Sequence, residues 1–309
     1  MIYLIDASHL LHRIKHTPLA ELFDSEGRPT GMVFGFFNSL CKIRRDTGNT
    51  ARFVICWDKT TSSFRTEMYE EYKADRSARD SNISDEDRQK LAEYNEARML
   101  IIELSNLLQI PTFQIHGVEA DDIIGHFARK DLGERKVILS EDSDLFQLLN
   151  DSTDQYCPVN GKYVTQYSFV DEQGLHADKF REQYIMILAM TGTHNNVTGI
   201  KGIGFKTARK ISEFLINGEE VPATSTKNKL FLTNQEIYHR NVKLVDIYHV
   251  LDTHNVSTMI KAEVTSRSCL GAPEYLFFDV MEYLKDLELN KIIDNLVTLE
   301  NSGYKGNLL

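Results

Sequence analysis

The stretch KVILSEDSDLFQLL (residues 136–149) combines the two features that decide the fold of this 309-residue chain. Its first residues are a short apolar run rich in β-branched side chains, which predicts a buried strand. Acidic residues follow that run directly, at Asp142 and Asp144. Their i, i+2 spacing places both carboxylates on one side of an extended segment. The stretch therefore predicts a strand that is followed by two carboxylates at the edge of a sheet.

Three further runs of the same kind occur in the chain, and helical patterns separate them. The runs are IYLID (2–6), RFVICWD (52–58) and TFQIHG (112–117), while residues 31–45 and 91–109 show apolar positions at helical spacing. Strands that alternate with helices predict an α/β fold with a mostly parallel central sheet covered by helices on both faces. In such folds the functional site lies beyond the carboxyl ends of the strands.

Composition sets the outer limits of the interpretation. A hydrophobic content of 42% is ordinary for a globular protein, and the net charge of −10 argues against a general nucleic-acid coat protein without excluding local basic patches. The four cysteines form no CxxC pair, which disfavours a zinc site or a disulfide framework and indicates a reducing cytoplasm. No signal peptide and no membrane-spanning run is expected.

The second half of the chain predicts a hairpin and then a helical region. Asn160-Gly161 stands between two short β-type runs, which is a hairpin signal, and the pattern is nearly all helical after about residue 175. The glycine-rich sequence GIKGIG (199–204) then leads into a helix. No strand precedes it, so it predicts a helix-hairpin-helix turn that grips a nucleic-acid backbone rather than a dinucleotide-binding loop. A simple helix-initiating turn remains the alternative.

Residues 60–88 are highly charged, poor in aliphatic side chains and too long for an ordinary connection. One interpretation is a solvated surface helix with a loop. The other is a mobile arch over the site, with cations facing phosphates and tyrosines that stack on bases. The residues concerned are Arg65, Lys73, Arg76, Arg79, Tyr69 and Tyr72.

Carboxylates accumulate at the predicted strand ends and at the start of the helix in VEADDIIGHFA. They are Asp6, Asp58, Glu119, Asp121, Asp122, Asp142 and Asp144. Any one of them could be a cap, and EADD could simply complement a helix dipole. Together at one sheet edge they would repel one another unless cations lay among them. Oxygen ligands without His or Cys favour Mg²⁺ or Mn²⁺, which suits phosphodiester hydrolysis.

This ordered set of motifs resembles the 5′ nuclease family, which includes flap endonucleases, the 5′–3′ exonuclease domain of bacterial DNA polymerase I and stand-alone bacteriophage 5′ exonucleases. The resemblance runs from MIYLIDASHLLHR to about residue 246, with FRTEMYEEYKADR similar to the base of the family's helical arch. It implies a PIN-like nuclease core over 1–185 with an arch at 60–90, a helix-hairpin-helix region over 186–255 and a helical tail over 256–309.

The resemblance also implies roles for particular residues. The seven carboxylates become the metal-site acids, Lys73 and Arg76 steer the scissile phosphate, and Tyr72 stacks on a base. The helix-hairpin-helix holds duplex DNA and often binds K⁺ through backbone carbonyls in this family. The expected DNA-contacting residues are Arg65, Tyr72, Arg79, Gly199, Lys201, Gly202, Gly204, Lys206 and Arg209.

One stretch, LAMTGTHNNVTGIKGIG (residues 188–204), departs from the family pattern. Two aspartates that normally complete the second metal site fall, without gaps, on Gly192 and Asn195. A weakened second metal site is therefore expected. Natural divergence is favoured over an engineered change, because the neighbouring Thr191 also departs from the family's glycine.

The sequence thus predicts a structure-specific 5′ nuclease that acts on DNA with a 5′ flap, a fork or a 5′ end, with RNA primers in RNA–DNA hybrids as a further substrate class. The rival is a catalytically impaired protein that binds flaps or forks. An RNA-processing nuclease of the PIN-like class is a third, weaker alternative, because that class lacks the helix-hairpin-helix. The expected location is the cytoplasm, of the host if the protein is phage-encoded.

Overall fold

The structure is a computed structural model, and it describes residues 1–60, 62–70, 72, 84–193, 197–270, 277–299, 301–306 and 308. Its centre is a six-stranded sheet with the strand order β3-β2-β1-β4-β5-β6. The strands are β1 (Ile2–Asp6), β2 (Arg52–Asp58), β3 (Thr112–Ile115), β4 (Lys136–Leu139), β5 (Thr153–Cys157) and β6 (Lys162–Val164). All neighbouring pairs are parallel except β5 and β6, which form the predicted hairpin at Gly161. The mostly parallel sheet is confirmed.

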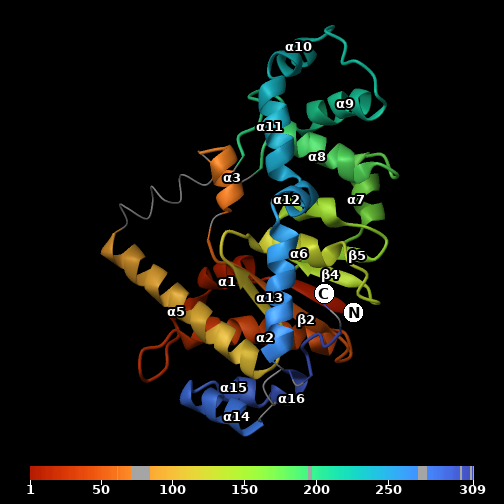
Figure 1. The fold of residues 1–309 in the computed structure, drawn as a ribbon. Coiled ribbons are helices and arrows are strands. Elements are labelled where there is room, and N and C mark those ends of the chain that lie inside the picture. Colours follow the sequence, from red (N-terminus) through yellow and green to blue (C-terminus); the bar gives the residue numbers. More distant parts are fainter. Residues whose placement is uncertain are drawn as a thin grey trace.

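Helices surround this sheet and continue beyond it at both ends (Figure 1). In the first half they are α1 (Ala7–Lys15), η1 (Pro18–Glu21), α2 (Thr30–Asp46), α3 (Ser63–Met68), α5 (Asp85–Leu107), α6 (Ala120–Ala128) and η2 (Ser143–Leu148). In the second half they are α7 (Gln166–Gln173), α8 (Phe180–Thr191), α9 (Phe205–Ile216), α10 (Thr226–Thr233), α11 (Gln235–Val245), α12 (Ile247–Thr253), α13 (Val256–Leu270), α14 (Phe277–Asp286), α15 (Asn290–Ile293) and α16 (Leu296–Leu299). In the described part of the chain, no helix combines the length and apolarity required to span a bilayer.

Both faces of the sheet are buried, because successive side chains of a strand point to opposite faces. On β1, Tyr3 and Ile5 belong to a hydrophobic cluster with α1, α2 and α5. Ile2 and Leu4 belong to a second cluster with α6, α12 and α13. This double burial explains why the strands read as continuous apolar runs rather than as alternating ones.

A third hydrophobic cluster joins α7 to α11 into a helical unit, which lies above β4 and β5 in Figure 1 and contacts η2 through α8. Helix α8 packs against both α9 and α11. It also runs across the 185–186 boundary that the sequence suggested, and Phe169 lies in the same cluster as Tyr184. Thr193 and Val197, from the loop that precedes the GIKGIG turn, line the cleft that holds the acidic residues.

The C-terminal tail contains a strand-like segment in addition to helices. Helix α14 packs beside α5, and beyond α16 the backbone at residues 302–304 lies along β2. The Phe53 amide donates to the Ser302 carbonyl at 2.7 Å, and the Tyr304 amide donates to the Phe53 carbonyl at 3.2 Å. The tail is thus helical over α13 to α16, and its last described residues add a short backbone bridge to β2 that the sequence did not predict.

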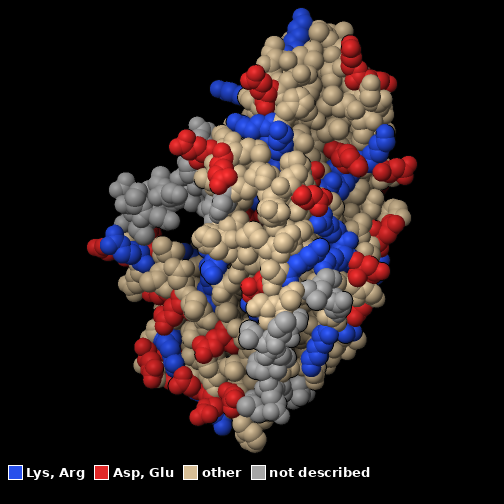
Figure 2. Space-filling view, in the orientation of Figure 1, with Lys and Arg blue, Asp and Glu red and all other residues tan. Residues whose placement is uncertain are grey.

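Acidic and basic side chains are distributed unevenly over the surface. Figure 2 shows Lys and Arg gathered beside α12 and α13, whereas Asp and Glu dominate around α5 and α14. The net charge of −10 therefore coexists with local basic regions. Such regions are what binding to a polyanion requires of an acidic protein.

Candidate active site

The acidic residues meet where the chain changes direction across the sheet. From β1 the chain builds β2 and β3 on one side and then crosses to β4 on the other. Asp6 ends β1, Asp58 ends β2, and Asp142 precedes η2 just after β4. Such a switch point leaves a crevice beyond the strand ends, which is the usual place for a ligand in an open α/β sheet.

Protein hydrogen bonds fix the acids nearest the sheet. Asp6 is 5% exposed, and its carboxylate accepts from the His9 amide at 3.0 Å and from the Ser140 hydroxyl at 2.9 Å. Asp58 accepts from the Ala120 amide at 2.8 Å, which ties the end of β2 to the start of α6. The roles of Ser140 and His9 in orienting Asp6 were not predictable, because both look like ordinary residues flanking a strand or a helix.

The electrostatics of this group favour a cation. Burial raises the pKa of Asp6 to about 6, and the negative charge of Asp58 adds to that increase. Burial also raises the pKa of Asp121 well above its usual range, with further contributions from the charges of Asp142 and Asp6. Carboxylates that resist ionisation for these reasons are relieved by a positive charge placed among them.

A small cleft of about 40 Å³ opens beside these residues. Four acidic residues line it, and Thr193, two residues beyond the end of α8, lines it too. The acidic residues are Glu119, Asp121, Asp142 and Asp144. The volume suffices for an ion with little water. Among the described residues, no three His, Cys, Asp or Glu side chains already converge on one ion-sized point.

The donor set nevertheless suits a hard divalent cation. Mg²⁺ retains several water ligands and takes one or two carboxylates directly, so it does not require a preformed cage of side chains. Carboxylates without thiol or imidazole partners favour Mg²⁺ or Mn²⁺ over softer metals. Asp121, Asp142 and Asp144 would hold such an ion in the cleft.

Two of the seven predicted metal acids have a protein cation as their partner. Asp122 is fully buried, and its two oxygens each lie 2.7 Å from a guanidinium nitrogen of Arg65. Glu119 accepts from Arg65 at 3.2 Å and from the Tyr72 hydroxyl at 2.9 Å. Asp122 is therefore a structural partner in this structure rather than a metal ligand. Glu119 lines the cleft but is also bound to Arg65.

These contacts correct the expected roles of two arch residues. Arg65 is 3% exposed, so it is not a surface cation that meets DNA phosphates. Tyr72 is 6% exposed, so its ring is not open for a base to stack on. Tyr69 is half-buried with the Arg240 guanidinium over its ring. Burial of an arginine between two carboxylates left no signal in the sequence, because Arg65 stands in a run of charged residues that looks solvated.

Other predicted residues, from the arch and from the loop after α8 that lacks carboxylates (residues 192–197, the acid-poor loop), lie outside the described residues. They are Lys73, Arg76, Arg79 and Asn195. Their expected roles remain predictions.

Gly192 lies at a close approach of two backbone segments. Its φ is +79°, and a Cβ there would lie 2.4 Å from the Val197 carbonyl oxygen and 2.5 Å from the Gly199 amide nitrogen. A Cβ on Gly199 would in turn lie 2.2 Å from the Thr191 carbonyl carbon. The backbone at this position therefore has no room for an aspartate, whereas the neighbouring Thr193 lines the cleft.

In and after the turn between α8 and α9, some predicted DNA-contacting residues are exposed and others are bonded within the protein. Lys201 and Lys206 are exposed, as expected for phosphate contacts. Arg209 instead donates to the Gly174 carbonyl at 3.0 Å, and the Gly202 carbonyl accepts from Lys227 at 2.7 Å. Gly202 has a φ of +92°, which explains the need for glycine there.

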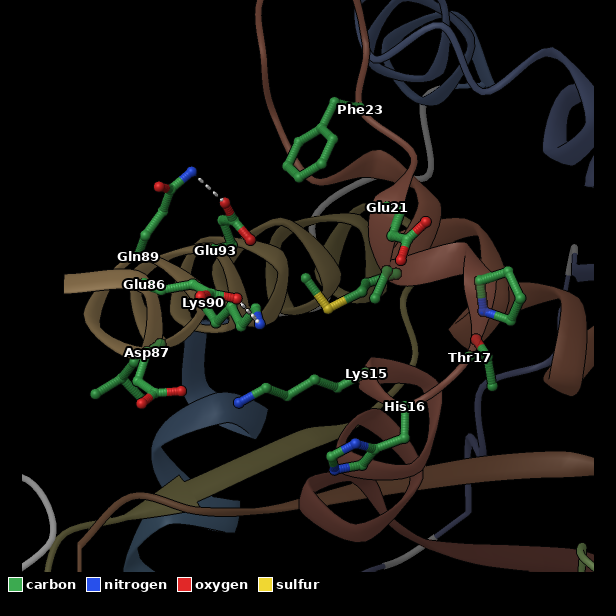
Figure 3. A pocket seen from close by; sticks show the side chains of 14 residues that line it. Lys15, His16, Thr17, Glu21, Phe23, Glu86, Asp87, Gln89, Lys90 and Glu93 are labelled. Carbon is green, nitrogen blue, oxygen red and sulfur yellow. Dashed lines mark hydrogen bonds and ion pairs between the residues drawn. The ribbon is translucent and has the colours of Figure 1, made fainter. Parts of the chain in front are cut away.

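A much larger cavity, of about 960 Å³, lies away from the acidic cleft, between α1, η1 and α5 (Figure 3). Lys15 points into it, but Lys90 is paired with Glu86, and further acids line the same space. None of the predicted metal-site residues lines it. Size alone therefore does not identify the functional site, and the chemistry concentrates in the small cleft.

Comparison with known proteins places the chain in a family. Residues 1–184 match the family model described as the 5′–3′ exonuclease, N-terminal resolvase-like domain. The chain is 34% identical over 215 residues to the thermostable DNA polymerase I of Thermus aquaticus, which covers 69% of this chain and 24% of the polymerase. It is 29% identical over 210 residues to a 5′–3′ exonuclease of Buchnera aphidicola, which covers 67% of this chain and 68% of that protein.

A solved structure shares the fold over nearly the whole length. The bacteriophage T5 flap endonuclease, in a complex with DNA and metal ions, superposes with a TM-score of 0.64 at 21% identity, covering 97% of this chain and 99% of the phage protein.

The structure defines an α/β protein with a mostly parallel sheet and an acidic crevice at its switch point. More narrowly, the chain belongs to the 5′–3′ exonuclease family, as the resemblance predicted. It spans about a quarter of the length of the DNA polymerase I relatives that it matches.

Proposed function

We propose that the protein is a divalent-metal-dependent 5′ nuclease that hydrolyses phosphodiester bonds in DNA with a 5′ flap, a fork or a free 5′ end. The observation that carries this proposal is the acidic cleft near the ends of β1 and β4, where burial and neighbouring negative charges raise the pKa of Asp121 and of the nearby Asp6. The phage T5 flap endonuclease of similar fold, crystallised with DNA and metal ions, supports the substrate class and the cofactor class.

In this proposal different side chains bind the metal, the DNA backbone and the scissile phosphate. Mg²⁺ or Mn²⁺, when bound, supplies charge neutralisation and an activated water for phosphodiester hydrolysis. Asp121, Asp142 and Asp144 hold the cation in the cleft, and Asp6 and Asp58 keep the surrounding field negative. Lys201 and Lys206 bind the duplex backbone without reading its sequence. Lys73 and Arg76 steer the scissile phosphate, as the family resemblance implies.

The second metal site is proposed to be weak. Gly192 supplies no side-chain oxygen, and the close backbone approach to Gly199 leaves no space for one. We expect the second ion to be recruited only with the help of substrate phosphates. Cleavage should therefore require millimolar rather than micromolar Mg²⁺.

The same observation favours one rival function. A protein that lost part of its metal site could bind flaps or forks without cutting them. Retention of Asp6, Asp121, Asp142 and Asp144 beside a polyanionic ligand argues against pure binding, because buried acids repel DNA unless cations offset them.

A cleavage experiment separates the two functions. A labelled 5′-flap DNA is incubated with the protein in 0–20 mM Mg²⁺ or Mn²⁺, beside a nicked duplex and an RNA-primed hybrid. The nuclease predicts metal-dependent cutting that Asp142→Asn abolishes and that Asp171→Asn, on the exposed face of α7, leaves intact. Flap binding without cutting at any metal concentration would establish the rival function.

We also propose that K⁺ plays a smaller part than the family resemblance implies. The Lys227 ammonium already donates to the Gly202 carbonyl of the turn between α8 and α9. Flap affinity measured in K⁺ and in Na⁺ at equal ionic strength should then differ by less than about twofold. Lys227→Met should restore a K⁺ preference if that carbonyl is part of the ion site.

A cytoplasmic location is the remaining part of the proposal. Cys41, Cys56 and Cys157 are buried free thiols, which suits a reducing compartment.

A further inference from the structure

Arg65 has a polar partner for each nitrogen of its guanidinium. Its Nε donates to the Leu244 carbonyl at 3.1 Å, and Nη1 and Nη2 donate to Asp122, both at 2.7 Å. Nη1 also reaches Glu119 at 3.2 Å. A planar fork that is pre-organised for two carboxylate oxygens loses little entropy on forming such bonds, and lysine cannot reproduce it.

These partners belong to three different parts of the fold. Arg65 lies on α3, Asp122 lies on α6, and Leu244 lies on α11. Helix α11 in turn holds the turn between α8 and α9, because Asn241 donates to the Ala189 and Thr198 carbonyls at 2.8 and 3.0 Å. Figure 1 shows α3 beside α11, above the sheet. One buried side chain therefore links the arch region, the acidic helix and the helical unit.

The link reaches the cleft through Glu119. This residue caps α6, accepts from Arg65, Tyr72 and the Ser62 amide, and lines the cleft with Asp121. Asp121 is on the first turn of the same helix. A displacement of the Arg65 guanidinium would therefore shift both the start of α6 and the carboxylates that it carries.

We infer that Arg65 is a positioning residue for the carboxylate cleft: it sets the placement of Glu119 and Asp121 and couples that placement to α11. The inference rests on the proposed nuclease function for its kinetic consequence, but not for its effect on metal binding. Arg65 borders the cleft but is 3% exposed, and its guanidinium is bound to Asp122 and Glu119. It acts through the residues that it orients, as hydrogen-bond partners of metal ligands commonly do.

The test compares Arg65→Lys with Arg135→Lys, a matched substitution of an arginine that is exposed and paired with Asp154. Three quantities are measured for each full-length variant. They are the unfolding temperature without metal, the Mn²⁺ concentration that gives half of the maximal rise in that temperature, and kcat and KM on the 5′-flap DNA. Only the last requires the protein to cut DNA.

Arg65→Lys should lower kcat about 10- to 100-fold and raise the Mn²⁺ midpoint by a similar factor, which is the usual effect of losing such a partner. KM should change less than about threefold. Arg135→Lys should leave all three quantities within about twofold of the wild-type protein. A purely structural role would lower the unfolding temperature and leave both kcat and the Mn²⁺ midpoint unchanged, and that result would overturn the inference.

Two controls keep the outcomes distinct. If Arg65→Lys does not fold, Asp122→Asn provides the same measurement, because it weakens the pair and keeps the side-chain volume. Failure of both variants to fold would mean that the contact is purely structural and would overturn the inference. If the wild-type protein cuts no DNA, the proposed function fails, and the Mn²⁺ midpoint alone decides the role of Arg65.

Discussion

Arg65 and Asp122 form a two-pronged ion pair in the interior of the protein, with 2.7 Å between each nitrogen and its partner oxygen. Removal of one member of a buried pair leaves the other charge unpaired, which typically costs about 3–5 kcal/mol. Asp122→Ala should therefore lower the free energy of unfolding by about that amount in urea denaturation. Asp252→Ala, which removes the partner of Arg129 in a more exposed pair, should change it by less than about 1 kcal/mol. Equal losses in the two variants would contradict the assignment.

The raised pKa values in the cleft predict an unusual pH dependence for the metal-free protein. The pKa of Asp6 rises from 3.8 to about 6 on folding, so between those values the folded state holds a proton that the unfolded state releases. Stability should thus be highest below about pH 4 as far as this group is concerned. It should fall as the pH rises through 6, by about 3 kcal/mol if Asp6 titrated alone. The measurement is urea unfolding from pH 4 to pH 8 with a metal chelator present.

Asp121 extends that effect, because its pKa lies well above the usual range. Asp121→Asn should stabilise the metal-free protein at pH 8 while it weakens the stabilisation that Mn²⁺ provides. The matched substitution Asp171→Asn, on α7, should do neither. Destabilisation of the metal-free protein by Asp121→Asn would mean that the cleft is not under electrostatic strain.

The glycine at 192 predicts that simple restoration of the family aspartate fails. Gly192→Asp should destabilise the protein by about 2 kcal/mol or more, because the side chain would collide with backbone atoms and a φ of +79° with extended ψ is nearly exclusive to glycine. Thr193→Asp places a carboxylate one residue further on, where Thr193 already lines the cleft. It should lower the Mg²⁺ concentration needed for half-maximal cleavage. Thr193→Asn, without the charge, serves as the control.

The C-terminal segment beside β2 predicts a stability effect far from the site. A Cβ on Gly303 would lie 2.2 Å from the Gln109 carbonyl oxygen, so Gly303→Ala should cost about 1–3 kcal/mol as the segment moves away. Gly204→Ala, where no atom lies within 4 Å of the added carbon, is the matched control. Thermal unfolding of both variants, without DNA, measures the difference. Equal melting temperatures would show that residues 302–304 do not hold the sheet edge.

Much of the fold could be predicted from the local pattern of apolar residues in the sequence. The β-branched runs at residues 2–6, 52–58 and 112–115 are strands because nothing else buries such short apolar segments on both faces. The position of Asp6 and Asp58 at adjoining strand ends was predictable, since the carboxyl ends of parallel strands meet. The pairing of Asp122 with Arg65 was not predictable, because it joins residues 57 positions apart and depends on how α3 folds back. The contact of residues 302–304 with β2 was not predicted either, because it also joins segments that are distant in the sequence.

The acid-poor loop shows a different limit. The absence of a carboxylate at Gly192 was visible in the sequence, but its structural reason was not. Only the close approach of Gly192 to Gly199 reveals that the backbone itself excludes a side chain there. Glycine at both positions could equally have marked two independent turns.

The central claim is tested most directly by the cleavage of 5′-flap DNA as a function of Mg²⁺ or Mn²⁺ concentration. Cleavage should require millimolar Mg²⁺, be lost in Asp142→Asn and be retained in Asp171→Asn. Cutting that saturates at low micromolar Mg²⁺ would contradict the weak second site. Tight flap binding with no cutting at any metal concentration would contradict the nuclease itself.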